Sequence, residues 1–175
     1  MKRWLMIAMM VSPLCSATLE RLSMDEMIAK STSIIRGTVS DSWAVFNGRD
    51  IYTHYKIQVD EGLKGPVQKS VDVTVPGGVY GTYHQTPSGS PVLNKGDQYI
   101  FFLWTSKAGV TWITGLTQGL FTVDRTSADP VATRTASREL MLDATTARPV
   151  KDNAVSLKIS DLRARIAKTG SGGVQ

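Results

Sequence analysis

Cysteine and histidine are scarce in this sequence of 175 residues, which contains one cysteine, Cys15, and two histidines, His54 and His84. A single cysteine cannot form an intramolecular disulfide, so the folded chain must be held together by core packing alone. The two histidines are 30 residues apart and show neither HxH nor HExxH spacing. The sequence therefore predicts no metal site and no cofactor.

Long apolar runs are also lacking. Two basic residues, the apolar residues 4–11 and a small-x-small site ending at Ala17 are typical of a secretory signal peptide over residues 1–17. The apolar run is about half the ~20 residues that a membrane helix needs, and no later run reaches that length. We therefore predict a periplasmic or secreted protein without a membrane span. The alternative is a lipoprotein acylated at Cys15, although Leu14 occupies a position where a small residue is expected.

Runs of one charge sign are missing as well. The formal net charge is +5, and removal of Lys2 and Arg3 with the signal peptide leaves +3. The remaining basic residues are scattered, and the sequence holds no nucleic-acid-binding motif. This distribution is typical of an ordinary solvated surface, so we expect no nucleic-acid partner.

The motifs of covalent catalysis are absent from the sequence. It has no GxSxG and no SxxK motif, and Ser88 lies near His84 only within a stretch rich in glycine and proline, which would hold the two side chains poorly. Any two of the 15 acidic residues could form the pair of a glycoside hydrolase, but no pattern selects them. We predict no catalytic residue and favour a non-enzymatic protein, with a cell-envelope hydrolase as the alternative.

Near its N-terminus the sequence contains a complete helix-capping motif. The Ser23 side chain can accept a hydrogen bond from the Glu26 amide while the Glu26 carboxylate accepts one from the Ser23 amide, and Leu22 can pack on Met27. These residues predict a short helix that ends near Lys30.

Apolar and polar residues then alternate with the period of two that is typical of half-buried strands. Residues 98–104 are apolar on both faces, as in a central strand. Asn47 and Gly48 predict a tight turn, and residues 107–109 predict a second hairpin. The predicted strands are residues 33–40, 51–61, 71–75, 98–104, 110–114 and 119–123.

This order of elements predicts a mainly β domain over residues 18–125. The expected fold is a small antiparallel Greek-key barrel of five or six strands, of the oligonucleotide/oligosaccharide-binding (OB) type, with a short N-terminal helix and a C-terminal helix. A flattened sandwich is the main alternative. Residues 126–169 are predicted as a polar excursion and the amphipathic C-terminal helix, and residues 170–175 as a disordered tail. The expected apolar side of that helix consists of Leu157, Leu162 and Ile166.

The segment with the least ordinary composition is residues 76–91, PGGVYGTYHQTPSGSP, which follows a predicted strand and is longer than most connections. Tyrosine rings offer amphipathic contact area, and neighbouring polar side chains offer adaptable hydrogen bonds. The predicted binding residues are Tyr80, Tyr83, His84 and Gln85. The other interpretation is that this segment folds back and packs a tyrosine onto the barrel.

A set of segments between Leu19 and Val123 carries a family resemblance: LERLSMDEMIAKSTSIIRGTV, IYTHYKIQVDEGLKG, VTVPGGVYG, NKGDQYIFFLW and ITGLTQGLFTV. In this order they resemble an uncharacterised family of exported bacterial proteins. More distantly, SIIRGTV followed by YKIQVDEGLKG is similar to the start of netrin-like domains and tissue inhibitors of metalloproteinases. That resemblance implies an OB-type barrel that acts by binding proteins. Those inhibitors place a disulfide-locked N-terminal cysteine on the target's zinc, which a chain beginning near Thr18 cannot do.

We therefore expect an exported, non-enzymatic binding module that engages a protein or a cell-envelope component. A protease-inhibitor-like role is the narrower form of this hypothesis. Besides the hydrolase, the alternative is a structural accessory subunit that packs into a larger assembly through its C-terminal helix. The sequence leaves the oligomeric state open.

Overall fold

The computed structural model describes residues 18–66, 68–124, 126 and 128–171. The predicted signal peptide with Cys15 and the last residues of the predicted tail, 172–175, lie outside the described residues. In chain order the elements are β1 (Thr18–Glu20), α1 (Met24–Lys30), β2 (Ser33–Phe46), β3 (Ile51–Lys64), β4 (Ser70–Pro76), β5 (Gly78–Tyr80), β6 (Tyr83–Gln85), β7 (Gln98–Thr105), β8 (Thr111–Ile113), the 3-10 helix η1 (Leu116–Gly119), β9 (Leu120–Asp124), β10 (Val131–Arg134), β11 (Leu140–Leu142), β12 (Pro149–Val150), β13 (Val155–Lys158) and α2 (Ile159–Ser171).

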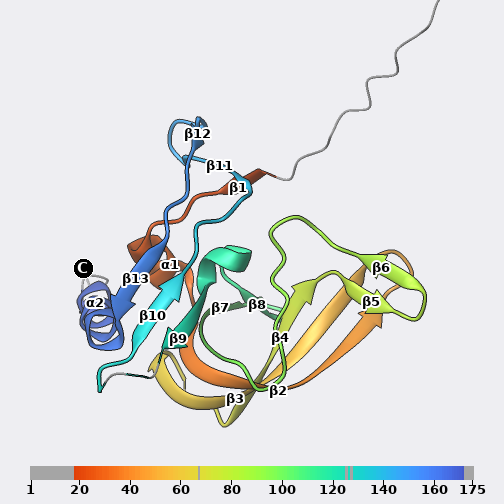
Figure 1. Cartoon of the computed structure of the whole chain (residues 1–175), viewed down its shortest axis with the longest axis horizontal. Coiled ribbons are helices and arrows are strands. Elements are labelled where there is room, and N and C mark those ends of the chain that lie inside the picture. The colour runs from red at the N-terminus through yellow and green to blue at the C-terminus, as the bar shows by residue number, and fades with distance from the viewer. Residues whose placement is uncertain (1–17, 67, 125, 127, 172–175) are drawn as a thin grey trace, which may run out of the picture.

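Five strands close into a barrel in the order β2, β3, β4, β8 and β7, with β7 pairing back to β2 (Figure 1). Neighbouring strands are antiparallel except β4 and β8, which run parallel. A closed five-stranded barrel of this kind is consistent with the OB type. The predicted fold class is confirmed, including the short N-terminal helix and the C-terminal helix, and the closure rules out the flattened sandwich.

Both predicted turns are present. Asn47 Oδ1 accepts hydrogen bonds from the amides of Arg49 (3.1 Å) and Asp50 (2.8 Å), which shapes the turn between β2 and β3. Gly48 has a φ of +90°, and Gly109, in the turn between β7 and β8, has a φ of +83°. Glycine adopts this left-handed backbone readily, so the turn sequences determine where these hairpins reverse.

The part of the chain after the barrel is more structured than its sequence suggested. Strands β9, β10 and β13 extend the main sheet beyond β7, and β1, β11 and β12 form a separate small sheet. The polar excursion predicted within residues 126–169 therefore contains strands that the sequence analysis missed. Strand β10 gave no apolar signal because its two buried residues are Ala132, a small residue, and Arg134, a charged one.

Hydrophobic cores lie on both faces of the central strands β2 and β7, which explains why residues 98–104 are apolar throughout. The core within the barrel includes Ile35, Ile57, Val73, Phe101 and Leu103. The core beneath α1 and α2 includes Met27, Ile28, Ile34, Ile100, Phe102, Leu162 and Ile166. Of the apolar side predicted for the C-terminal helix, Leu162 and Ile166 lie on α2, whereas Leu157 lies on β13 and is partly buried.

The start of α1 has the predicted capping box. Ser23 Oγ accepts from the Glu26 amide (3.3 Å) and Glu26 Oε2 accepts from the Ser23 amide (2.8 Å). The hydrogen bonds from the side chain and amide of Ser23 lower the pKa of Glu26. Asp25, in the same first turn, accepts two hydrogen bonds from Arg165 (2.6 and 3.0 Å), so the two helices are joined by an ion pair as well as by packing.

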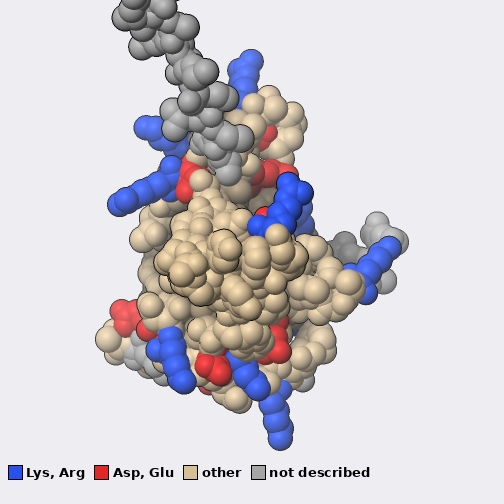
Figure 2. Space-filling view, turned by 90° about the vertical axis from the view of Figure 1, so that its right-hand side faces the viewer, with Lys and Arg blue, Asp and Glu red and all other residues tan. Residues whose placement is uncertain are grey.

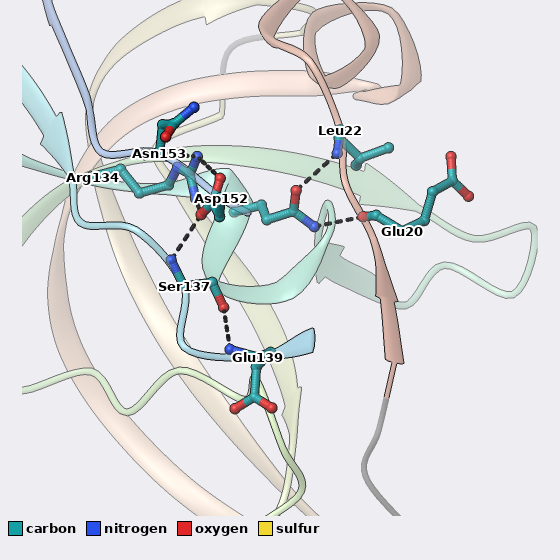
Figure 3. Close-up of polar contacts among 8 residues, drawn as sticks. Glu20, Leu22, Arg134, Ser137, Glu139, Asp152 and Asn153 are labelled. Atoms are coloured by element: carbon teal, nitrogen blue, oxygen red, sulfur yellow. Dashed lines mark hydrogen bonds and ion pairs between the residues drawn. The ribbon is translucent and has the colours of Figure 1, made fainter. Parts of the chain in front are cut away.

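A buried ion pair fixes the segment between β10 and β13 (Figure 3). Arg134 donates from Nη1 and Nη2 to the two carboxylate oxygens of Asp152, at 2.5 and 3.0 Å, and the Ser137 amide donates to the same carboxylate at 2.8 Å. The two charged side chains are only 7% and 2% exposed. Burial alone would raise the pKa of Asp152, but the hydrogen bonds from Arg134 and Ser137 outweigh it and hold the pKa below its ordinary value.

The buried side chain of Gln118, on η1, connects the N-terminal strand to the barrel. Its Oε1 accepts from the Leu22 amide (2.9 Å), and its Nε2 donates to the Glu20 carbonyl (2.9 Å) (Figure 3). Among the described residues, no helix has the length and apolar character needed to cross a membrane.

Candidate functional site

Residues 78–85, within the segment 76–91 that the sequence predicted as a long connection, form a small hairpin. Strands β5 and β6 pair antiparallel, with Gly78 opposite Gln85, Val79 opposite His84 and Tyr80 opposite Tyr83. Gly81 in the turn has a φ of +59°. Because Tyr80 and Tyr83 are directly opposite each other, their rings project from the same face of the hairpin.

The hairpin is attached to the start of β3 and to Asp50, the residue before it, by four hydrogen bonds. The Gly77 amide donates to the Ile51 carbonyl and the Thr53 hydroxyl donates to the Gly77 carbonyl, both at 2.7 Å. Gln85 Oε1 accepts from the Ile51 amide at 2.6 Å, and Gln85 Nε2 donates to Asp50 Oδ1 at 3.4 Å. Of the predicted binding residues, Gln85 is therefore engaged within the chain, where it positions the hairpin.

Two glycines allow this close attachment. Gly77 has a φ of +89°, and a Cβ there would lie 2.4 Å from Pro87 Cδ. Gly78 has a φ of +134°, and a Cβ there would lie 2.1 Å from Thr53 Oγ1. A side chain at residue 78 would clash with Thr53 of β3, and one at residue 77 would clash with Pro87 and the Gln85 carbonyl, so both glycines are required by the packing.

Tyr80 and Tyr83 both pack on Phe46, the last residue of β2, and both remain accessible. The rings of Tyr83 and Phe46 are stacked, with centroids 5.4 Å apart and planes 12° apart, and the Tyr80 ring lies 5.9 Å from the same ring. Tyr80 is nevertheless 46% exposed and Tyr83 61% exposed. The two interpretations from the sequence, contact and packing, are thus combined, since each ring is supported by Phe46 and still offers surface to solvent.

Three further exposed apolar side chains lie on the same strands but point to the opposite faces, because successive side chains of a strand alternate. Trp43 and Val45 from the outer part of β2 and Val79 from β5 are each at least 40% exposed. The Trp43 ring is held by stacking on His54, with centroids 5.3 Å apart and planes 7° apart. We call the rings of Tyr80 and Tyr83, with Phe46 beneath them, the tip surface. Tyr80 and Tyr83 are two of the eight large hydrophobic residues that are exposed among the described residues.

The side of the molecule that carries β5 and β6 bears few charges at its centre. In Figure 2, which looks at this side, Lys, Arg, Asp and Glu lie mostly toward the margin and uncharged residues cover the middle. An uncharged surface that carries the exposed rings of Tyr80 and Tyr83 is typical of an interaction site.

A cavity of about 440 Å³ lies beside the tip surface. His84 and Gln85 line it, together with Thr53 and Tyr55 of β3. Among the described residues that line this cavity, none is Lys, Arg, Asp or Glu. The structure therefore separates the predicted binding residues into two exposed rings, Tyr80 and Tyr83, and two residues at the cavity, His84 and Gln85.

The two histidines do not meet. His54 Nδ1 lies 3.3 Å from the Thr74 hydroxyl on the outside of the barrel, while His84 belongs to β6. Within residues 18–66, 68–124, 126 and 128–171, no three His, Cys, Asp or Glu side chains gather in a way that could hold a metal ion.

Phe46 was not among the residues predicted from the sequence. It lies in SWAVF, where β2 continues beyond the predicted end of its strand, and this stretch is apolar on both faces just before the Asn47 turn. An apolar strand end next to a turn is a signal for exposed apolar residues there, but it does not reveal the contact of Phe46 with residues 80 and 83. In comparisons with known proteins, no family model matches this chain, and no curated protein matches it.

Proposed function

We propose that this protein is an exported, non-enzymatic binding module, periplasmic or secreted, that engages a protein or a cell-envelope component through the tip surface. The observation that carries the proposal is the pair of half-exposed tyrosines, Tyr80 and Tyr83, supported from behind by Phe46. Rigid, exposed aromatic rings are common anchors in interfaces because they bury a large area with little loss of conformational entropy.

The rigidity of the support favours binding over a passive connection. The hairpin is fixed to β3 through Gly77 and Gln85, so its aromatic residues are already placed before a partner arrives. Pre-organisation of this kind lowers the entropic cost of association. The resemblance to netrin-like domains and metalloproteinase inhibitors agrees with a protein partner, and a protease is the narrower candidate, bound without zinc chelation.

A comparative pull-down tests the proposal. The mature protein, with an intact N-terminus and a C-terminal tag, is used as bait on periplasmic extract or culture medium of the native host. We expect a discrete partner to be retained by the wild type and lost with the Tyr80→Ala/Tyr83→Ala variant. Leu140→Ala removes another exposed apolar side chain, 46% exposed on β11, and serves as the matched control.

If the double variant and the wild type capture the same proteins in the same amounts, the tip surface is not the binding site. Export is tested on the same material. Mass spectrometry of the native protein should find Thr18 as the first residue, whereas a lipid-modified Cys15 would show that the chain is a lipoprotein.

A further inference from the structure

The outer part of β2 has a neighbouring strand on one side only. β2 pairs with β3 along its whole length as far as Phe46, but it pairs with β7 only from Ser33 to Thr38. The last backbone hydrogen bonds on the β7 side are made by Val39, whose amide donates to the Asp97 carbonyl at 3.0 Å and whose carbonyl accepts from the Gly96 amide at 2.8 Å. β5 lies near the tip of β2 but pairs only with β6 (Figure 1). Residues 42–46 therefore form a free sheet edge.

The backbone groups that point outward along this edge can be identified. The Asn47 amide donates to the Asp50 carbonyl at 3.1 Å, which makes these two residues a hydrogen-bonded pair. Bonded and non-bonded pairs alternate along an antiparallel ladder, so the amides and carbonyls of Ser42, Ala44 and Phe46 point away from β3. Among the described residues, none donates to or accepts from these outward groups.

The residue opposite Phe46 supports this assignment independently. Ile51 is paired with Phe46 across the ladder. Its carbonyl accepts from the Gly77 amide and its amide donates to Gln85 Oε1, both on the side away from β2. The amide and carbonyl of Ile51 thus point away from β2, as expected for a non-hydrogen-bonded pair. The amide and carbonyl of Phe46, its partner in the pair, must therefore point away from β3, toward the free edge.

The edge also lacks the features that usually protect an exposed strand. Natural edge strands carry lysine, proline or a bulge that prevents pairing with another chain. The last of the three register irregularities between β2 and β3 lies between Val39 and Asp41, before the free edge begins. Residues 42–46 read SWAVF, without charge or proline, and Trp43 and Val45 are exposed.

The 440 Å³ cavity lies directly beside this edge. Ser42, Trp43 and Ala44 line one part of it, and Ser90, Pro91 and Val92 line another. A strand added to β2 would direct alternate side chains to the cavity side, because successive residues of a strand point to opposite faces. The uncharged lining selects small apolar or hydroxyl side chains at those positions.

We propose that the free edge of β2 binds an extended, uncharged segment of a partner protein as an added strand, with every second side chain in the cavity. This inference rests on the proposed function and names the class of partner. Backbone hydrogen bonds to Ser42, Ala44 and Phe46 supply affinity, and the cavity supplies sequence preference. A second copy of this chain fits less well. If two β2 edges paired, the small side chains of Ser42 and Ala44 from the second copy would leave the cavity largely empty. Phe46 of the second copy could not fill it, because its ring packs against Tyr80 and Tyr83 of its own chain.

The test uses a capped seven-residue peptide that alternates valine and threonine, with a terminal lysine for solubility. Amide hydrogen exchange of the mature protein is measured by NMR with and without this peptide. We expect the amides of Ser42, Ala44 and Phe46 to become protected, while those of Trp43 and Val45, already bonded to β3, change little. A peptide with the same side chains but with every backbone amide N-methylated should not bind, because it can donate no backbone hydrogen bond along either edge. Equal binding of both peptides, or no selective protection, overturns the proposal.

A matched pair of variants tests the edge from the protein side. Ala44→Pro removes the outward amide of residue 44, and proline is tolerated on edge strands because no bond to β3 is lost. It should weaken peptide binding at least tenfold, whereas Ala44→Ser, which keeps the amide, should not. If Ala44→Pro folds poorly, the hydrogen-exchange pattern and the methylated peptide still test the proposal, because both measurements use the wild-type protein.

Two further outcomes would overturn strand addition. One is a wild-type dimer in sedimentation that Ala44→Pro dissociates, which would assign the edge to a second copy. The other is normal capture of the native partner by Ala44→Pro when Tyr80→Ala/Tyr83→Ala has lost it, which would leave the proposed function standing without the added strand.

Discussion

At the scale of single residues, Tyr80 and Tyr83 combine two roles that are usually separated. Each ring packs on Phe46 and remains about half accessible, so each is placed by the fold and is still available to a partner. A fully buried aromatic residue would be a packing element, and a fully exposed one would be mobile. The intermediate position is the one expected of an interface anchor.

We predict that Tyr80→Ala/Tyr83→Ala has a small effect on folding. Truncation of a fully buried aromatic residue costs about 3–5 kcal/mol, and rings that are 46% and 61% exposed lose much less packing. The melting temperature should fall by only a few degrees while circular dichroism stays unchanged. A fall of many degrees with partner capture intact would show that the rings serve packing alone.

Among the charged residues, we predict that Asp152 contributes most to the stability of the fold. Asp152→Ala leaves the buried guanidinium of Arg134 without its partner, and loss of one member of a buried pair costs about 3–5 kcal/mol. Urea unfolding should show this loss. Replacement of both members together, Arg134→Met with Asp152→Leu, should recover most of the stability. A double variant as unstable as Asp152→Ala would contradict this account.

The lowered pKa of Asp152 predicts that the stability of the fold depends on pH. The pKa of Asp152 is lowered on folding from its ordinary 3.8, so its contribution to stability is complete above that value and is lost as the pH falls through the folded pKa. The free energy of unfolding of the wild type should therefore decrease below about pH 4 more steeply than that of the Arg134→Met/Asp152→Leu variant. Parallel pH profiles would show that other carboxylates dominate acid unfolding.

At the scale of elements, the sequence predicted what is determined locally. The capping box of Ser23 and Glu26 and the turn at Asn47 depend on residues within a few positions of each other, and both are present. The β5–β6 hairpin and strand β10 depend on distant contacts, such as Gln85 with Ile51 and Arg134 with Asp152. A sequence pattern does not reveal a strand whose buried residue is an arginine paired 18 positions away.

Some residues of the candidate site could likewise be predicted from the local sequence, and others could not. Tyr80 and Tyr83 could be identified by composition because exposed tyrosines in a glycine-rich segment are unusual. Phe46, their support, could not, since nothing in the sequence places the end of β2 beneath residues 80 and 83. The free edge of β2 could not be predicted either, because it depends on β7 ending its pairing at Thr38.

The cap of α1 gives a prediction for an element. Ser23→Ala removes the hydroxyl that accepts a hydrogen bond from the Glu26 amide. The other bond of the capping box, from the residue 23 amide to the Glu26 carboxylate, can remain. Such changes cost about 1 kcal/mol, within a range of 0.5–2. Denaturant unfolding should show this decrease, and Ser23→Asp, which keeps a capping oxygen, should show much less. Equal stability of Ser23→Ala and the wild type would mean that packing alone holds α1.

At the scale of the whole molecule, the described residues include no cysteine and no group of three His, Cys, Asp or Glu side chains that could hold a metal ion. The central strands β2 and β7 bury side chains on both faces, so two cores share one sheet. Burial of apolar area contributes about 25 cal/mol per Å², which is the main stabilising term available to such a fold.

We therefore predict that neither chelator nor reductant changes the melting temperature of the mature protein. The single cysteine lies in the predicted signal peptide, and the two histidines have separate surroundings on β3 and β6. Scanning calorimetry with and without EDTA, and with and without dithiothreitol, checks this. A clear drop with EDTA would reveal a structural metal and contradict the account of the fold.

The central claim, that the tip surface contacts a partner, is tested most directly by photo-crosslinking in the native host. A benzophenone amino acid replaces Tyr83 in one variant and, as a control on the exposed side of α2, Lys168 in another. The account predicts a light-dependent adduct of discrete mass from position 83 that is absent from position 168. No adduct from position 83, or the same adduct from both positions, would contradict it.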